Sequence, residues 1–248
     1  MPTSGHPDRI LAVIPARLAS TRLPRKPLLP IAGRPLLAWV VDAARACPHF
    51  ADVIVAADSE EVAALCRAHG WPVQLTDPNL PSGTDRLHVV ALQHPADIYV
   101  NIQGDEPLLT PAHITALLRP FALGAHVQVT TIKVPCTPEN VNNPNAVKVV
   151  TAADGRALYF SRATIPFDRD SSRPTIWKHI GLYAYRSAAL TRFTQLAPSP
   201  LELTERLEQL RFLENGVTIH VEPVTEDTVG VDTPDDLRTV EQILLQRQ

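Results

Sequence analysis

The sequence predicts an α/β fold with a mostly parallel central sheet flanked by helices. Short apolar runs alternate with segments whose apolar residues recur at helical spacing, which is typical of a parallel sheet covered on both faces. The length of 248 residues suits one large domain. The hydrophobic fraction of 45% is that of a globular protein, and no apolar run reaches the roughly 18 residues that span a bilayer.

The alternation is regular as far as residue 134. Apolar runs predict strands at residues 10–14, 53–57, 73–75, 98–102 and 127–134. Helical spacing predicts helices at residues 35–47, 59–69, 84–93 and 110–123. Pro35 and Pro111 fall at the starts of two of these helices, where proline is favoured, and Asp58 or Ser59 would cap the second helix.

The alternation breaks at residue 135. Residues from about 135 to 180 hold two strand-like pieces, 146–151 and 157–160, and we interpret this segment as an inserted lid or dimer contact. Beyond it we expect a strand at 180–185, helices at 188–195 and 201–215, a strand at 217–221 and a final helix at 234–246. Residues 1–248 are thus predicted to form a single domain with one insertion.

Composition argues against several classes of protein. A net charge of -3 offers no basic surface for nucleic acid. Residues 1–9 are polar and lack the apolar core of a signal peptide, so we expect a cytoplasmic protein with no membrane insertion. Cys47, Cys66 and Cys136 are far apart and odd in number, which predicts buried free thiols.

A basic loop follows the first predicted strand. Arg17, Arg22, Arg25 and Lys26 occur within eleven residues after Pro15, with no acid among them. Open α/β sheets bind ligands at the carboxyl ends of their strands. Cations there favour a phosphate-rich ligand held by charge-assisted hydrogen bonds. A solvated basic loop is the alternative interpretation.

Two acidic segments are candidates for a metal site. Asp105 follows the predicted strand 98–102 through Gly104, and a carboxylate at that end suits Mg²⁺, which uses one or two carboxylates with substrate phosphates. A turn with solvent-facing acids is the alternative. Thr233 and Asp236 have a helix-capping account, which leaves Asp232 available as the second metal carboxylate.

The segment from Ser82 to Arg86 has two interpretations. Ser82 or Thr84 can cap the following helix, which the local pattern favours. Alternatively, Gly83 allows the backbone to approach a nucleobase or ribose closely. No set of Ser, His and Asp or of Cys and His typical of a nucleophilic enzyme is evident in the sequence.

Together these segments resemble the family of 3-deoxy-manno-octulosonate (Kdo) cytidylyltransferases, or CMP-Kdo synthetases. The resemblance extends over about residues 10–245 and is carried by residues 15–28, 82–86, 101–107, 159–162, 178–186, 207–211 and 231–234. One departure is Arg25, which stands where the family usually has glycine.

The resemblance implies a fold, a reaction and a set of partners. The fold would be the Rossmann-like nucleotidyltransferase fold, working as a homodimer to which the inserted segment contributes. The reaction would transfer CMP from CTP to the anomeric hydroxyl of Kdo, releasing pyrophosphate, with Mg²⁺ as the cofactor. Its product would be activated Kdo for lipopolysaccharide biosynthesis.

The resemblance also implies roles for individual residues. The catalytic residues would be Lys26, Arg22, Asp105 and Asp232, of which Asp105 and Asp232 would bind the metal. The nucleotide would be bound by Pro15, Ala16, Arg17, Arg22, Lys26, Ser82, Gly83, Gln103 and Asp105. The sugar acid would be bound by Gln103, Arg162, His179, Tyr183, Glu208 and Gln209.

Three other functions are considered. The first is a cytidylyltransferase for a related sugar acid, such as an amino analogue of Kdo. The second is a non-catalytic nucleotide-binding protein, against which the retention of Lys26, Asp105 and Asp232 argues. The third is a glycosyltransferase on a similar sheet, which would usually carry an Asp-x-Asp metal motif. We expect no such motif in this chain, because Asp105-Glu106 follows a different pattern.

Overall fold

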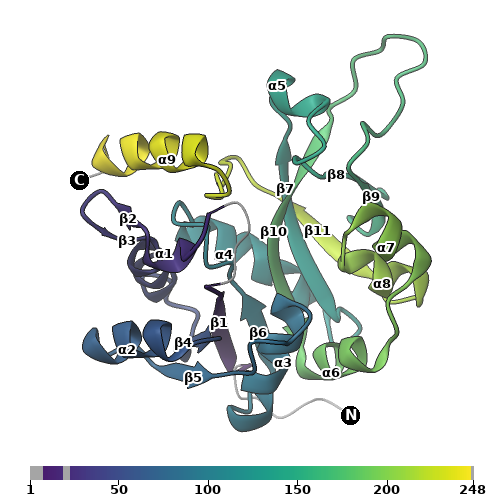
Figure 1. Ribbon diagram of the computed structural model, residues 1–248. Helices are drawn as coiled ribbons and strands as arrows, with labels where there is room; N and C mark the ends of the chain where they lie inside the picture. Colours follow the sequence, from purple (N-terminus) through teal and green to yellow (C-terminus); the bar gives the residue numbers. More distant parts are fainter. Residues whose placement is uncertain (1–7, 19–22, 247–248) are drawn as a thin grey trace. The chain divides into compact units, whose positions relative to one another are not determined.

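The computed structural model describes residues 8–18 and 23–246 (Figure 1). The chain divides into two compact units. Unit 1 comprises Met1–Pro111 together with Val229–Gln248, and unit 2 comprises Ala112–Thr228. The predicted α/β fold with a mostly parallel sheet flanked by helices is confirmed.

Unit 1 is built on a parallel four-strand array in the order β6-β1-β4-β5. These strands are β1 (Ile10–Ala16), β4 (Asp52–Ala57), β5 (Val73–Leu75) and β6 (Ile98–Asn101). Every residue of β1 after Ile10 is buried, as expected for a strand of a parallel sheet that is covered on both faces.

Strand β1 extends two residues beyond the prediction, through Pro15 and Ala16. Pairing of β1 with β6 ends at Val13 and Asn101, whereas its pairing with β4 continues to Ala16. Pro15 therefore lies beyond the last pair on the β6 side, where its missing N–H breaks no ladder hydrogen bond.

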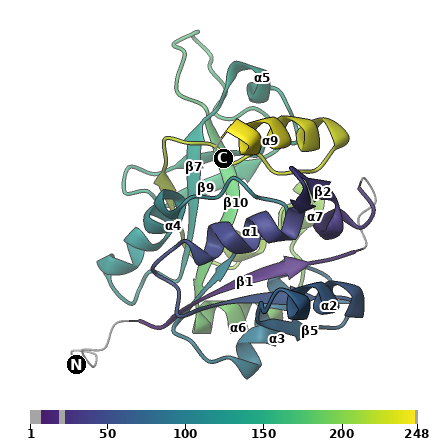
Figure 2. The ribbon, with the colours of Figure 1, turned by 90° about the vertical axis from the view of Figure 1, so that its left-hand side faces the viewer.

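Helices cover both faces of this sheet. The helices are α1 (Leu36–Arg45), α2 (Glu60–Ala68) and α3 (Gly83–Gln93), and α1 and α3 lie on opposite sides of β1 (Figures 1 and 2). The buried residues of α1 recur at helical spacing along one side of the helix. Ser59 caps α2 by accepting a hydrogen bond from Val62 N at 3.3 Å, so the second of the two predicted caps is the one used.

The last helix, α9 (Pro234–Gln246), completes unit 1 with the bounds predicted from the sequence. Its Val240 and Leu244 pack in one buried cluster with Ile31 and Leu36. Glu241 also accepts a hydrogen bond from Ala32 N at 2.8 Å, between the short strands β2 (Pro30–Ile31) and β3 (Arg34–Pro35), beside which α9 lies in Figure 1.

Unit 2 contains mostly antiparallel strands in the order β11-β7-β10-β8-β9, in which β7 and β11 are parallel. Its strands are β7 (Val129–Pro135), β8 (Lys148–Thr151), β9 (Ala157–Ser161), β10 (Trp177–Arg186) and β11 (Ile219–Pro223). Its helices are α4 (Pro111–Leu118), α5 (Pro138–Val141), α6 (Ser187–Gln195), α7 (Pro200–Glu205) and α8 (Gln209–Glu214), and a 3-10 turn, η2, spans Arg119–Leu123.

Two predicted helices of unit 2 are interrupted. The helix expected at 110–123 changes to 3-10 at Arg119, because Pro120 cannot donate an α-helical hydrogen bond. The helix expected at 201–215 was wrong as a single element: Arg206 adopts a left-handed conformation (φ 56°, ψ 48°) and separates α7 from α8. This break allows Arg211 of α8 to face Glu202 of α7.

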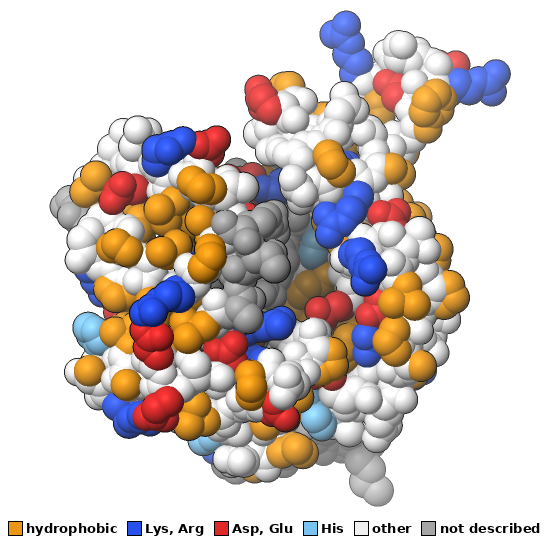
Figure 3. Space-filling model, in the orientation of Figure 1, with side chains coloured by type: hydrophobic (Ala, Val, Ile, Leu, Met, Phe, Trp, Pro, Cys, Tyr) orange, Lys and Arg blue, Asp and Glu red, His pale blue; other side chains and the backbone are white. Residues whose placement is uncertain are grey.

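The three cysteines are free, as predicted, but only two are buried. Burial raises the pKa of Cys47 and of Cys66 to about 11, so both thiols are protonated at neutral pH. Cys136 is partly exposed. Within the described residues no helix is long and apolar enough to cross a membrane. On the face drawn in Figure 3, acidic and basic side chains are interspersed.

Candidate active site

Three charged residues from separate segments of unit 1 meet in one cluster. Lys26 Nζ lies 2.5 Å from Asp105 Oδ2 and 3.0 Å from Asp232 Oδ1. Lys26 begins the 3-10 turn η1 (Lys26–Leu28), Asp105 follows β6, and Asp232 precedes α9. The side chains of Lys26, Asp105 and Asp232 are 16%, 26% and 46% exposed, so the cluster opens to solvent on the side of Asp232.

The charge state of this cluster follows from its geometry. Burial alone would lower the pKa of Lys26, but the charge and hydrogen bond of Asp105, assisted by Asp232, outweigh burial and raise the pKa above its ordinary value. Lys26 is therefore a fixed cation at neutral pH, held between two carboxylates.

Close backbone contacts position Asp105. A Cβ atom at Gly104 would lie 2.6 Å from the carbonyl oxygen of Pro15, so the glycine is required by this approach to β1. The carbonyl of Asp105 accepts a hydrogen bond from Val231 N at 2.8 Å, next to Asp232. Gly104 and Asp105 therefore contact both the end of β1 and the residues that precede α9.

Asp58, at the end of β4, holds the start of the basic loop. Its backbone N–H donates to Ala16 O at 3.2 Å, and its carboxylate oxygens accept from Leu18 N at 3.1 and 3.2 Å. The side chain of Arg17, between these anchors, is exposed. From the sequence, Asp58 is predicted only as a possible helix cap, so its role in the loop was missed. Arg22 lies outside the described residues.

Arg25, the departure from the family pattern, keeps the backbone conformation that favours glycine. Its φ of 59° and ψ of 28° are left-handed, a conformation that costs a residue with a side chain about 1–2 kcal/mol. Its guanidinium forms an ion pair with Glu61 of α2. The side chain that replaces the usual glycine therefore has its partner on α2.

The start of α3 supplies the other predicted nucleotide residues. Ser82 is the N-cap of α3: it accepts from Asp85 N at 3.1 Å and donates to Asp85 Oδ2 at 2.7 Å, which confirms the capping interpretation. A Cβ at Gly83 would lie 3.6 Å from Pro15 Cγ, so the helix begins against the buried end of β1. Gln103 is half-buried between β6 and Asp105. Pro15, Ser82, Gly83, Gln103 and Asp105 are thereby grouped at the carboxyl ends of the strands.

In unit 2, two predicted sugar residues lie on β10 on either side of an irregularity between Ile180 and Tyr183. The His179 ring nitrogen Nε2 lies 2.9 Å from Thr131 Oγ1. Burial lowers the pKa of His179 to about 3, so the imidazole is neutral. The ring of Tyr183 lies 5.3 Å from that of His179, and its buried hydroxyl has no hydrogen-bond partner among the described residues.

Arg162, just after β9, is held by backbone carbonyls. Its guanidinium donates to Glu205 O at 2.8 Å and to Pro144 O at 2.9 Å. The Glu205 carboxylate accepts from Arg162 N at 2.9 Å and from Ser161 Oγ at 2.6 Å. Arg162 thus joins β9 to the end of α7, a contact that sequence reasoning did not foresee.

The break at Arg206 separates the remaining predicted residues from α7. Glu208 is the N-cap residue of α8, and Gln209, its first residue, is 7% exposed. Arg211 donates to Glu202 of α7 at 2.7 and 2.5 Å, and both side chains are about 10% exposed or less. This buried ion pair links the two short helices and orients the turn that carries Glu208 and Gln209.

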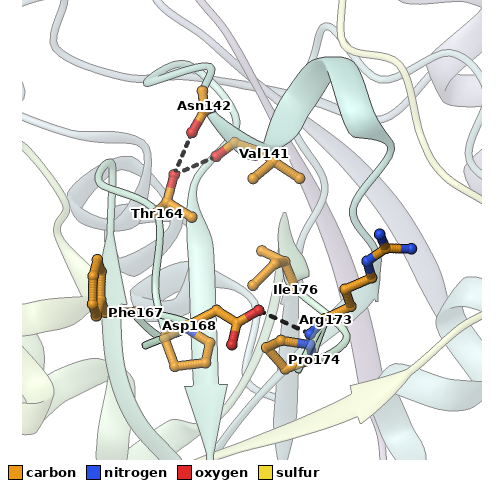
Figure 4. A pocket seen from close by; sticks show the side chains of 9 residues that line it. Val141, Asn142, Thr164, Phe167, Asp168, Arg173, Pro174 and Ile176 are labelled. Atoms are coloured by element: carbon orange, nitrogen blue, oxygen red, sulfur yellow. Dashed lines mark hydrogen bonds between the residues drawn. The ribbon is translucent and has the colours of Figure 1, made fainter. Parts of the chain in front are cut away.

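The inserted segment of unit 2 contains a cavity of about 370 Å³ (Figure 4). Thr164 Oγ1 donates to Val141 O at 2.8 Å and to Asn142 Oδ1 at 3.0 Å, which joins its two sides. Phe167 lines the cavity and is 87% exposed. Its lining comprises Val141, Asn142, Thr164, Pro166, Phe167, Asp168, Arg173, Pro174 and Ile176.

The same segment contains an Asp-x-Asp sequence, Asp168-Arg169-Asp170, so the expectation that the chain lacks this motif was wrong. The oxygens of Asp168 accept hydrogen bonds from Ser172 N at 2.9 Å and Arg173 N at 2.8 Å. The side chain of Asp170 is 87% exposed. Asp168 therefore closes a turn, which accounts for this acidic pair without a metal.

Comparison with known proteins identifies the family. A family model described as Cytidylyltransferase matches residues 11–219, which defines the class as cytidylyltransferase. A 3-deoxy-manno-octulosonate cytidylyltransferase of Acidobacterium capsulatum is 62% identical over 96% of this chain and 98% of its own length. One of Koribacter versatilis is 55% identical over 96% of this chain and 91% of its own length. The chain belongs to the 3-deoxy-manno-octulosonate cytidylyltransferase family.

A solved structure agrees with this assignment. It is that of CMP:2-keto-3-deoxy-manno-octonic acid synthetase complexed with CTP, which matches with a TM-score of 0.93 and 38% identity. The match covers 97% of this chain and 100% of that one. The resemblance drawn from the sequence motifs is thereby confirmed.

Proposed function

We propose that this protein transfers the CMP group of CTP to the anomeric hydroxyl of Kdo, releasing pyrophosphate. One observation carries the proposal: a lysine and two aspartates from separate segments converge within 3.0 Å at the carboxyl ends of the strands, where α/β sheets bind ligands. Two relatives that match this chain over nearly their whole length are named for this reaction.

In the proposed reaction the anomeric hydroxyl of Kdo loses its proton to solvent, its oxygen attacks the α-phosphorus of CTP, and the bond from that phosphorus to the bridging oxygen of pyrophosphate breaks. Positioning and charge stabilisation carry most of the catalysis of such a step. Arg17, Arg22 and Lys26 would hold the triphosphate as cations. Backbone groups of Pro15, Ala16, Ser82 and Gly83 would contact the cytidine, and Gln103 would contact both substrates.

The carboxylates of Asp105 and Asp232 fit a bound Mg²⁺ ion. Both carboxylates contact the same cation, the Lys26 ammonium, so they are close enough together to bind one positive ion at the same time. Among the described residues no group of three or more His, Cys, Asp and Glu side chains could hold a metal, so the other ligands would be phosphate and water oxygens. When bound, Mg²⁺ would neutralise phosphate charge and, as a Lewis acid, polarise the phosphoryl oxygens, which makes the phosphorus more electrophilic.

For the sugar acid we propose Arg162, His179, Tyr183, Glu208 and Gln209. A neutral His179 can offer the sugar a hydrogen bond but no charge, because its pKa is about 3. The cation for the Kdo carboxylate would then be Arg162, which must exchange a backbone carbonyl such as that of Pro144 for the ligand. The buried hydroxyl of Tyr183 is available to donate to a sugar oxygen.

The direct test is pyrophosphate release from CTP, with and without Kdo, in Mg²⁺ or in EDTA. Release that requires both Kdo and Mg²⁺ supports the proposal. Pyrophosphate release with another sugar acid but not with Kdo would show that Kdo is not the substrate. CTP binding without pyrophosphate release for any sugar acid would refute the transfer reaction.

Two variants test the assigned roles. Asp105→Ala should abolish turnover while its circular dichroism spectrum stays that of the wild type, and a wild-type kcat would contradict the metal role. Arg162→Ala should chiefly raise the KM for Kdo. A change confined to the KM for CTP would remove Arg162 from the sugar site.

We also propose that the protein is a cytoplasmic homodimer that supplies activated Kdo for lipopolysaccharide biosynthesis. The exposed Phe167 beside an apolar cavity supports a protein contact in the inserted segment, since large exposed apolar side chains mark interaction surfaces. Phe167→Asp should shift the mass measured by light scattering from dimer to monomer. An unchanged dimer would place the interface elsewhere.

A further inference from the structure

Lys26 engages both carboxylates that the proposed function assigns to the metal. Its Nζ lies 2.5 Å from Asp105 Oδ2 and 3.0 Å from Asp232 Oδ1, and its side chain is only 16% exposed. The ammonium is therefore not a solvated surface charge that happens to pass near the site. The side chain of Lys26 is mostly buried, and its ammonium group donates hydrogen bonds to the carboxylate oxygens that a divalent ion would use.

A divalent ion and this ammonium compete for the same electrostatic position. Mg²⁺ requires oxygen ligands at about 2.1 Å in near-octahedral geometry. An oxygen that already accepts a short hydrogen bond from an ammonium has a lone pair engaged, and the positive charge beside it repels a second cation. Withdrawal of Lys26 from Asp105 Oδ2 and Asp232 Oδ1 would release these two oxygens and remove the competing positive charge.

We propose that Lys26 is an internal counter-ion that keeps the metal out until the nucleotide arrives. The triphosphate of CTP offers the ammonium a new anionic partner and brings phosphate oxygens for the metal. Nucleotide and metal therefore bind with positive coupling, and the metal alone binds weakly. The inference rests on the proposed function, because that function supplies the triphosphate and the metal.

The test is Mn²⁺ binding followed by electron paramagnetic resonance, first without nucleotide. Lys26→Met keeps the length of the side chain and removes its charge, and Lys26→Arg keeps the charge. We expect Lys26→Met to bind Mn²⁺ roughly tenfold more tightly than the wild type, which corresponds to about 1.4 kcal/mol. Lys26→Arg should stay close to the wild type, and Asp105→Asn added to Lys26→Met should abolish the gain.

A second measurement adds CTP. We expect CTP to tighten Mn²⁺ binding of the wild type by a larger factor than that of Lys26→Met, because the variant has no ammonium to displace. Equal Mn²⁺ affinity of the wild type and Lys26→Met without nucleotide would overturn the counter-ion role, as would an equal effect of CTP on both.

The wild-type pyrophosphate assay separates these failures. If Kdo- and Mg²⁺-dependent release occurs but Lys26→Met gains no Mn²⁺ affinity, the counter-ion inference fails and the proposed function stands. If no sugar acid supports release but Lys26→Met gains affinity that Asp105→Asn removes, the cation competition stands and the proposed function fails.

Discussion

Gly104→Ala tests whether the approach of two backbones sets the position of Asp105. The added methyl would lie 2.6 Å from Pro15 O, whereas ordinary contact begins at 3.4 Å, so the backbones must separate by about 0.8 Å. Asp105 is the next residue and would move with them. A misplacement of about 1 Å can cost 10²-fold in rate, and overpacking costs about 1–3 kcal/mol of stability. We expect a kcat reduced by about two orders of magnitude on this basis.

The assay is steady-state pyrophosphate release combined with urea unfolding. Gly230→Ala is the matched control, since its methyl would meet nothing closer than Asp105 O at 3.9 Å. It should behave like the wild type in both measurements. The reasoning is refuted if Gly104→Ala keeps kcat within about twofold of the wild type, or if Gly230→Ala loses as much.

Three further predictions concern the loop, the buried histidine and Arg25. Asp58→Ala removes the acceptor of Leu18 N–H and should raise the KM for CTP roughly tenfold with less effect on kcat. Asp58→Asn should restore much of the affinity for CTP, and an unchanged KM in Asp58→Ala would show that Asp58 does not position the loop. His179 has a pKa of about 3 in the fold and takes up its proton below about 6.5 when unfolded, so its contribution to stability is full above about pH 6.5 and lost as pH falls toward 3, by up to about 1.4 kcal/mol per pH unit. His179→Gln should remove this part of the pH slope in urea unfolding, and parallel slopes would contradict the assignment. Arg25→Gly should stabilise the fold by about 1 kcal/mol in the same assay by relieving the left-handed conformation, and a loss of stability would show that the Glu61 ion pair outweighs the strain.

The parallel half of the fold was predictable because its signals are local. The strand at 73–75 and the helix at 234–246 have the predicted bounds, and a capping Thr233 with Pro234 marks the start of the helix. The helix expected at 201–215 failed for the opposite reason. Most of its residues favour helix, and the contacts that accompany the end of α7 at Arg206 are tertiary: Arg211 pairs with Glu202, and Ser161 donates to Glu205.

In the candidate site, likewise, residues with a local sequence signal could be predicted and residues held by distant contacts could not. Asp232 stood out because Thr233 and Asp236 account for the cap without it, and Asp236 N indeed donates to Thr233 Oγ1 at 3.2 Å. The role of Asp58 could not be predicted, because Asp58 and Ser59 are both common N-cap residues and the sequence does not show which of them caps α2. The contact of Asp58 with Leu18, forty residues away, has no periodicity by which a sequence can reveal it.

Unit 1 is made from both ends of the chain, with unit 2 as one continuous segment between them. A ribosome therefore completes all of Ala112–Thr228 before it makes Asp232, Val240 or Leu244. Until then Lys26 and Asp105 lack their third partner, and Ile31 and Leu36 lack the helix that covers them. The nascent chain therefore carries an unfinished first unit while unit 2 is made, and the charged cluster can close only after Ala112–Thr228 has been synthesised.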